Sequence, residues 1–75
     1  MTTDDNLIRM ANQIGTFFES MPDRTEALEG IARHLKNFWD PRMRRALLAQ
    51  VDAADNPDIH DIVLAAVHAH RALLH

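Results

Sequence analysis

The sequence predicts an all-α protein, a small bundle of four short helices joined by tight Asp/Asn-Pro turns. Three observations carry this prediction. Apolar residues recur at intervals of three and four along most of the chain, which is the pattern of one helical face. Each of the three prolines stands between two such apolar stretches, and only two glycines occur. No stretch shows the strict alternation of apolar and polar residues that is typical of a strand.

The length of 75 residues predicts a single helical domain spanning residues 1–75. A chain of this size buries only about 60% of the surface that it exposes when unfolded. It contains no cysteine, so neither a disulfide framework nor a thiolate metal site is expected. Such a chain either packs well as a helical unit or depends on a partner for part of its stability.

The first predicted helix covers about residues 5–20. Asp4 or Asp5 can cap it, and one face carries the apolar residues Leu7, Met10, Ala11, Ile14, Phe17, Phe18 and Met21. Ile8 lies off this stripe, one heptad before Gly15. That pair predicts a small apolar patch outside the first core contact.

The second predicted helix covers about residues 24–39. Pro22 ends the first helix, and Asp23 with Glu26 resembles a capping box in which Asp replaces Ser or Thr. Its apolar stripe consists of Leu28, Ile31, Ala32, Leu35, Phe38 and Trp39. We therefore expect both aromatic residues to belong first of all to the core, and Gly30 to lie on the opposite side.

The third predicted helix covers residues 41–52. Asp40 serves as its N-cap and Pro41 as its first residue, a position where proline is well tolerated. Met43, Leu47, Leu48 and Val51 point inward. Arg44 falls within the same apolar arc, where a charge is costly to desolvate unless it is paired. Either its stem lies on apolar surface with the head in water, or it contacts a partner protein.

The fourth predicted helix covers about residues 57–74, with Asn56 as its cap and Pro57 at its first position. Its apolar face consists of Ile59, Ile62, Val63, Ala66, Val67, Leu73 and Leu74. His70 interrupts this face and is expected to be partly exposed or locally bonded. His68 and His75 lie a heptad apart, about 10 Å along a helix, which is too far to share a metal ion.

The chain lacks the residue patterns of most catalytic and ligand-binding sites. It has no glycine-rich phosphate loop and no plausible Ser/His/Asp group, and its carboxylates are scattered over caps and first helical turns. The net charge of −3 argues against a nucleic-acid partner, although the run from Arg42 to Arg45 could touch phosphate. We expect no catalytic residue, cofactor or metal on this chain.

The expected location is cytoplasmic, with no membrane association. The N-terminus is acidic and lacks the basic region of a signal peptide, and no apolar run approaches the ~20 residues that cross a bilayer.

Three blocks of residues carry a specific resemblance. They are residues 7–14 followed by Phe17-Phe18, residues 31–35, and the run Phe38-Trp39-Asp40-Pro41-Arg42-Met43-Arg44. In this order they resemble the small delta subunit of the soluble, NAD-dependent, molybdenum-containing formate dehydrogenases of bacteria. The resemblance extends from about Leu7 to Leu48. From Ala53 onwards the chain resembles that family only as a generic helix.

The resemblance implies a non-catalytic subunit that supports assembly, stability or cofactor loading of the large catalytic (alpha) subunit. In such complexes the large subunit binds molybdopterin guanine dinucleotide and iron–sulfur clusters. The other subunits, beta and gamma, carry FMN, further clusters and the NAD site. The residues implied as contacts with the partner are Ile8, Arg9, Asn12, Gln13, Trp39, Asp40, Arg42, Met43 and Arg44.

Two other functions remain open at this point. The chain could be a maturation chaperone that binds transiently during insertion of the molybdenum cofactor and then leaves. It could also be a stand-alone helical regulator that touches nucleic acid through residues 42–45.

Overall fold

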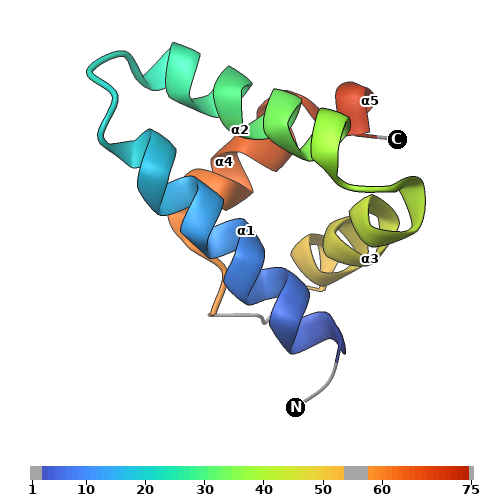
Figure 1. Ribbon diagram of the computed structural model, residues 1–75. Coiled ribbons are helices and arrows are strands. Elements are labelled where there is room, and N and C mark those ends of the chain that lie inside the picture. Colours follow the sequence, from blue (N-terminus) through green and yellow to red (C-terminus); the bar gives the residue numbers. More distant parts are fainter. Residues whose placement is uncertain (1–2, 54–57, 75) are drawn as a thin grey trace.

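A computed structural model describes residues 3–53 and 58–74, and over these ranges it confirms the all-α prediction, with no strand. Four longer helices and one short helix follow one another (Figure 1): α1 (Thr3–Glu19), α2 (Arg24–Phe38), α3 (Pro41–Asp52), α4 (Asp61–Ala69) and α5 (Arg71–Leu74). The bounds of the first three helices lie within two residues of those predicted.

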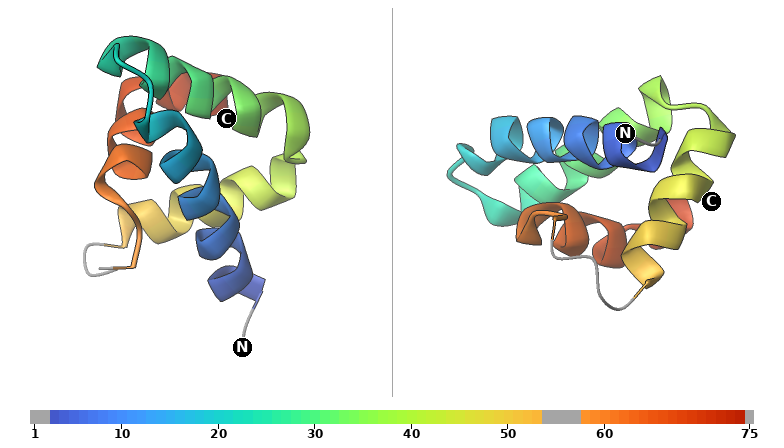
Figure 2. Two further views of the ribbon diagram at one scale, coloured as in Figure 1. Left: turned by 60° about the vertical axis from the view of Figure 1, so that its left-hand side comes forward. Right: turned by 90° about the horizontal axis from the view of Figure 1, so that it is seen from below.

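The first two helices diverge from the loop that joins them, and the remaining helices pack around them. Figures 1 and 2 show α1 and α2 close together at this loop and apart at their other ends. In Figure 1, α4 lies behind α1 and α2 and packs against both of them. The helix α3 packs on α1, and the short helix α5 packs on α2. The core consists of Leu7, Ile8, Ala11, Ala27, Ile31, Leu35, Trp39, Leu47, Leu48, Ile59, Ile62, Val63, Ala66, Val67 and Leu74.

Local sequence signals place the starts of α2 and α3 as predicted. The carboxylate of Asp23 accepts a 3.2 Å hydrogen bond from the backbone N–H of Glu26. The carboxylate of Asp40 accepts one of 2.8 Å from the N–H of Met43, and Pro41 is the first residue of α3. Each cap satisfies a backbone donor that has no partner inside the helix, which fixes where the helix begins.

The predicted start of the fourth helix is wrong, since α4 begins at Asp61. Residues 58–60 are not helical, and Asn56 and Pro57, the predicted cap and first position, lie outside the described residues. The side chain of Asn12 on α1 explains the late start. Its Nδ2 donates a 2.7 Å hydrogen bond to the carbonyl of Asp58, and its Oδ1 accepts one of 2.9 Å from the N–H of His60. These bonds hold the segment that precedes α4 against α1.

The fourth predicted helix is also interrupted, because α4 ends at Ala69 with His70 as its C-cap. His70 is half-buried, as expected. The short helix α5 follows. Arg71 donates hydrogen bonds from its two terminal guanidinium nitrogens, Nη1 and Nη2, to the carboxylate of Asp52 at the end of α3, with an Nη1–Oδ1 distance of 2.9 Å. These bonds raise the pKa of Arg71 and tie α5 to α3.

The patch predicted from Ile8 and Gly15 is not a surface patch, because both residues are buried. A Cβ atom on Gly15 would lie 2.7 Å from Cγ2 of Val63 and 3.0 Å from Cγ2 of Ile62. The glycine therefore lets α4 approach α1 closely. The second apolar side of α1 is used for this packing inside the molecule.

Two predictions on α2 are also corrected. Gly30 does not lie away from the packed side, because a Cβ on it would lie 2.5 Å from the ring of Phe18. Trp39 is buried as predicted, but Phe38 remains 74% exposed. The helix ends at Phe38, and Trp39 takes an extended conformation with φ −100° and ψ 136°. This turn directs the indole inward and leaves the phenyl ring outside.

Candidate functional site

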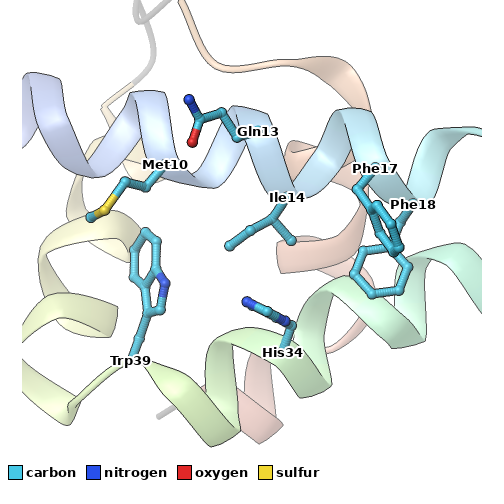
Figure 3. Close-up of a pocket in the computed structure, with 7 residues that line it drawn as sticks. All are labelled: Met10, Gln13, Ile14, Phe17, Phe18, His34 and Trp39. Carbon is cyan, nitrogen blue, oxygen red and sulfur yellow. The ribbon is translucent and has the colours of Figure 1, made fainter.

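A groove between α1 and α2 presents an unfilled, mostly apolar surface. Its volume is about 480 Å3. Figure 3 shows the residues that line it: Met10, Gln13, Ile14, Phe17, Phe18, His34 and Trp39.

A continuous run of aromatic side chains begins in this groove and ends at Phe38, which lies outside the groove lining and contacts His34. Phe17 and Phe18 meet edge to face with ring centroids 5.1 Å apart, and Phe18 lies 6.4 Å from the imidazole of His34. His34 in turn lies 4.7 Å from the ring of Phe38. The run thus begins on α1 and ends on α2, with a largely exposed phenyl ring at each end. Phe17 is 72% exposed.

The groove exists because the apolar stripe of α1 is wider than the face that the fold buries. At about 100° per residue, the buried residues Leu7, Ile8, Ala11 and Gly15 span an arc of roughly 100°. Met10 and Phe17 lie outside this arc by roughly 60° and 80°. They belong to the same sequence stripe, yet no helix of the described structure covers them.

The chemistry of the groove lining is almost entirely apolar. Trp39 lies at one end opposite Met10, and Phe17 and Phe18 lie at the other, as Figure 3 shows. The polar side chains of the lining are those of Gln13 and His34, and none of the lining residues is an Asp, Glu, Lys or Arg. Within residues 3–53 and 58–74, no cluster of His, Asp and Glu side chains suits a metal ion. The groove is therefore suited to apolar groups of a ligand or protein.

A second hollow, the cationic hollow, which carries two arginines, is lined by residues that follow Trp39 in the sequence. It has a volume of about 300 Å3 and is lined by Asp40, Pro41, Arg42 and Arg45. The carboxylate of Asp40 is engaged in capping α3. Both arginines are exposed, and neither takes part in an ion pair among the described residues. Trp39 lies at one end of the apolar groove, and Asp40, the next residue in the sequence, lines the hollow.

Arg44, the residue singled out on α3, is inside the fold and only 7% exposed. Its Nη1 donates a 3.1 Å hydrogen bond to the carbonyl of Lys36 on α2, and its buried Nε has no partner in the described part of the chain. The sequence suggested either a guanidinium in water or one bound to a partner protein, and neither describes this contact. The guanidinium is bound within the molecule, at the end of a neighbouring helix.

The structure divides the other predicted contact residues into two groups. Ile8 and Trp39 are buried, Asn12 and Asp40 make hydrogen bonds that hold the fold, and Met43 is half-buried against the core. Arg9, Gln13 and Arg42 are exposed. Gln13 and Trp39 line the apolar groove, and Asp40 and Arg42 line the cationic hollow.

The sequence reasoning missed the groove residues Phe17 and His34, and it missed the exposure of Phe38 beside the groove. A signal for Phe17 was present, because adjacent residues of a helix point about 100° apart. Phe17 and Phe18 therefore cannot both face the centre of one contact. The adjacent pair Phe38 and Trp39 carried the same signal, but which of the two faces the core depends on the turn at Trp39.

Together, the fold and the groove define a small helical protein with an apolar aromatic surface of the kind that receives a partner. One protein family matches the sequence of this chain. The chain belongs to the NADH-dependent formate dehydrogenase delta subunit family, FdsD, whose sequence model matches residues 6–67. It is thus a delta subunit of an NAD-dependent formate dehydrogenase.

The match confirms the resemblance read from the sequence and extends it into α4, beyond the point where only a generic helix was recognised. No curated protein and no solved structure matches the chain. In the part of the chain that the structure describes, no helix combines the length and the apolar character that crossing a bilayer requires.

Proposed function

We propose that this delta subunit is a non-catalytic accessory subunit that docks on the large, catalytic alpha subunit of the formate dehydrogenase. In that role it supports assembly, stability or cofactor loading of the alpha subunit. The proposal rests on one observation above all. A chain that belongs to a family of complex subunits leaves two phenyl rings, Phe17 and Phe38, largely exposed at the ends of an aromatic run. Exposed apolar surfaces of this kind mark contact sites, and aromatic residues dominate the binding energy of interfaces.

The proposal assigns the cofactors to other subunits. Molybdopterin guanine dinucleotide and iron–sulfur clusters belong to the alpha subunit, and FMN and the NAD site belong to its beta and gamma partners. The almost uncharged groove lining supports a protein contact more than a cofactor phosphate or metal cluster. The proposed location is the cytoplasm.

Expression of the dehydrogenase genes with and without this chain tests the proposal. With a tagged alpha subunit, we expect the delta subunit to co-purify in a one-to-one ratio. We expect the complex produced without it to be less stable or to contain less molybdenum per alpha subunit. A delta subunit that elutes alone under assembly conditions contradicts the proposal.

The same preparation separates a permanent subunit from a transient maturation chaperone. A chaperone would be substoichiometric in the purified, active enzyme, while molybdenum content would still fall in its absence. The third function considered from the sequence, a stand-alone regulator, gains no support from the family match.

A further inference from the structure

We infer that the apolar groove and the cationic hollow together receive one amphipathic helix of the alpha subunit. Large apolar side chains on one face of that helix fill the groove, and a carboxylate at one of its ends meets Arg42 and Arg45. This inference rests on the proposed function, because it specifies which element of the alpha subunit the delta subunit binds.

The kind of occupant follows from the backbone of the delta subunit. Within the described residues all regular structure is helical, so no strand edge is present to which an extended peptide could add. A groove between two helices instead suits the apolar face of a third.

Because the groove lining has no charged side chain, we expect the face of the bound helix that enters the groove to be apolar. A charged side chain placed there would lose its hydration and find as polar neighbours only Gln13, His34 and the indole N–H of Trp39. Leu, Met or Phe side chains would bury their own surface and that of Phe17 and Phe38. We therefore expect apolar residues at three- and four-residue spacing on the bound helix.

The two arginines of the cationic hollow indicate that one end of the bound helix carries a carboxylate. The chain has a net charge of −3, yet three of its eight Lys/Arg residues fall between Arg42 and Arg45. Arg44 is used within the fold, whereas Arg42 and Arg45 have no ion pair in the described part of the chain. A local positive patch on an acidic protein complements a carboxylate and speeds the encounter with an acidic partner.

Another hollow of about 440 Å3, bordered by Glu29, Arg33 and Leu73, supplies matched controls. Its two charged residues already pair with each other through a 2.9 Å contact between Arg33 Nε and Glu29 Oε1. It also contains an exposed apolar residue, since Leu73 is partly accessible. Substitutions there change the same residue types outside the proposed docking surface.

Binding to the purified alpha–beta–gamma complex, produced without delta and immobilised, tests the apolar half of the inference. We expect Phe17→Gln and Phe38→Gln each to weaken binding of the delta subunit at least tenfold. Leu73→Gln, the control, should stay within twofold of wild type. Phe17 and Phe38 variants that bind like wild type overturn the inference while leaving the proposed function intact. Absence of binding by the wild-type subunit overturns both.

Association rates at low and high salt test the charged half. The double variant Arg42→Gln/Arg45→Gln should associate several-fold more slowly than wild type at low salt, and the difference should shrink at high salt. Arg33→Gln should show wild-type rates. Equal rates and equal salt dependence for the double variant contradict the inferred carboxylate contact.

Photocrosslinking identifies the occupant directly. A photoreactive phenylalanine analogue at position 17 or 38 of the delta subunit should crosslink to alpha-subunit residues spaced by three or four. Crosslinks to another subunit, to a second delta chain, or to an alpha-subunit segment without helical spacing overturn the inference.

Discussion

The guanidinium of Arg44 on α3 donates a 3.1 Å hydrogen bond through Nη1 to the carbonyl oxygen of Lys36 in the last turn of α2. The last four carbonyls of a helix have no partner within it, and this end carries the negative part of the helix dipole. The arginine therefore supplies both a donor and a compensating charge at a helix end. It joins the two helices across the tight turn at Asp40 and Pro41.

Arg44→Ala should therefore destabilise the isolated delta subunit. The substitution removes the carbonyl contact and the packing of the buried stem, so we expect a loss of about 1–3 kcal/mol in the free energy of unfolding. Urea denaturation measures it. Arg45→Ala, an exposed change on the same helix, is the control and should stay within about 0.5 kcal/mol of wild type. If Arg44→Ala instead left stability unchanged and weakened binding to the alpha subunit, the contact suggested by the sequence would be supported.

Local signals explain why so much of the fold follows from the sequence. The start of α3 is fixed by Asp40 and Pro41, two adjacent residues whose capping geometry does not depend on the rest of the molecule. The same holds for Asp23 at the start of α2. By contrast, α4 starts where the side chain of Asn12, almost fifty residues earlier in the chain, holds the preceding segment.

The parts of the site that the sequence did not predict depend on how the helices pack against one another. Periodicity shows that α1 has a broad apolar stripe, but it does not show which part of the stripe the fold covers. Gly15 allows α4 to pack close to one side of α1, and this contact leaves Phe17 uncovered on the other. Arg44 appeared out of place for a similar reason, since its partner is a backbone carbonyl that no side-chain pattern reveals.

Asn12→Ala should destabilise the fold because it removes two hydrogen bonds to the backbone before α4. A net contribution of about 1 kcal/mol for each bond predicts a loss of about 1–3 kcal/mol. Hydrogen exchange should also show faster exchange of the His60 amide. Gln13→Ala changes the adjacent exposed residue and should alter neither property. Unchanged protection at His60 in the Asn12 variant would contradict the assigned contact.

Gly15→Ala should destabilise the delta subunit even though alanine favours helix more than glycine does. The new Cβ would lie 2.7 Å from Val63, so α1 and α4 must move apart, at a cost of about 1–3 kcal/mol. Thermal denaturation measures this loss. Gly30→Ala provides the comparison, because there the close neighbour is the ring of Phe18, which can turn into the open groove. A loss at Gly30 that equals or exceeds the loss at Gly15 would contradict this distinction.

Phe17→Gln and Phe38→Gln should leave the free energy of unfolding of the isolated subunit within about 0.5 kcal/mol of wild type. Both rings are more than 70% exposed, so their removal takes little apolar surface out of the core. The contrasting change is Leu35→Ala on the same helix as Phe38. Leu35 is fully buried, and its truncation should cost about 2–5 kcal/mol. Chemical denaturation compares the three variants. A stability loss at Phe17 or Phe38 similar to that at Leu35 would mean that these rings hold the fold together. The expected result would show that the two exposed phenylalanines are not needed for the stability of the fold.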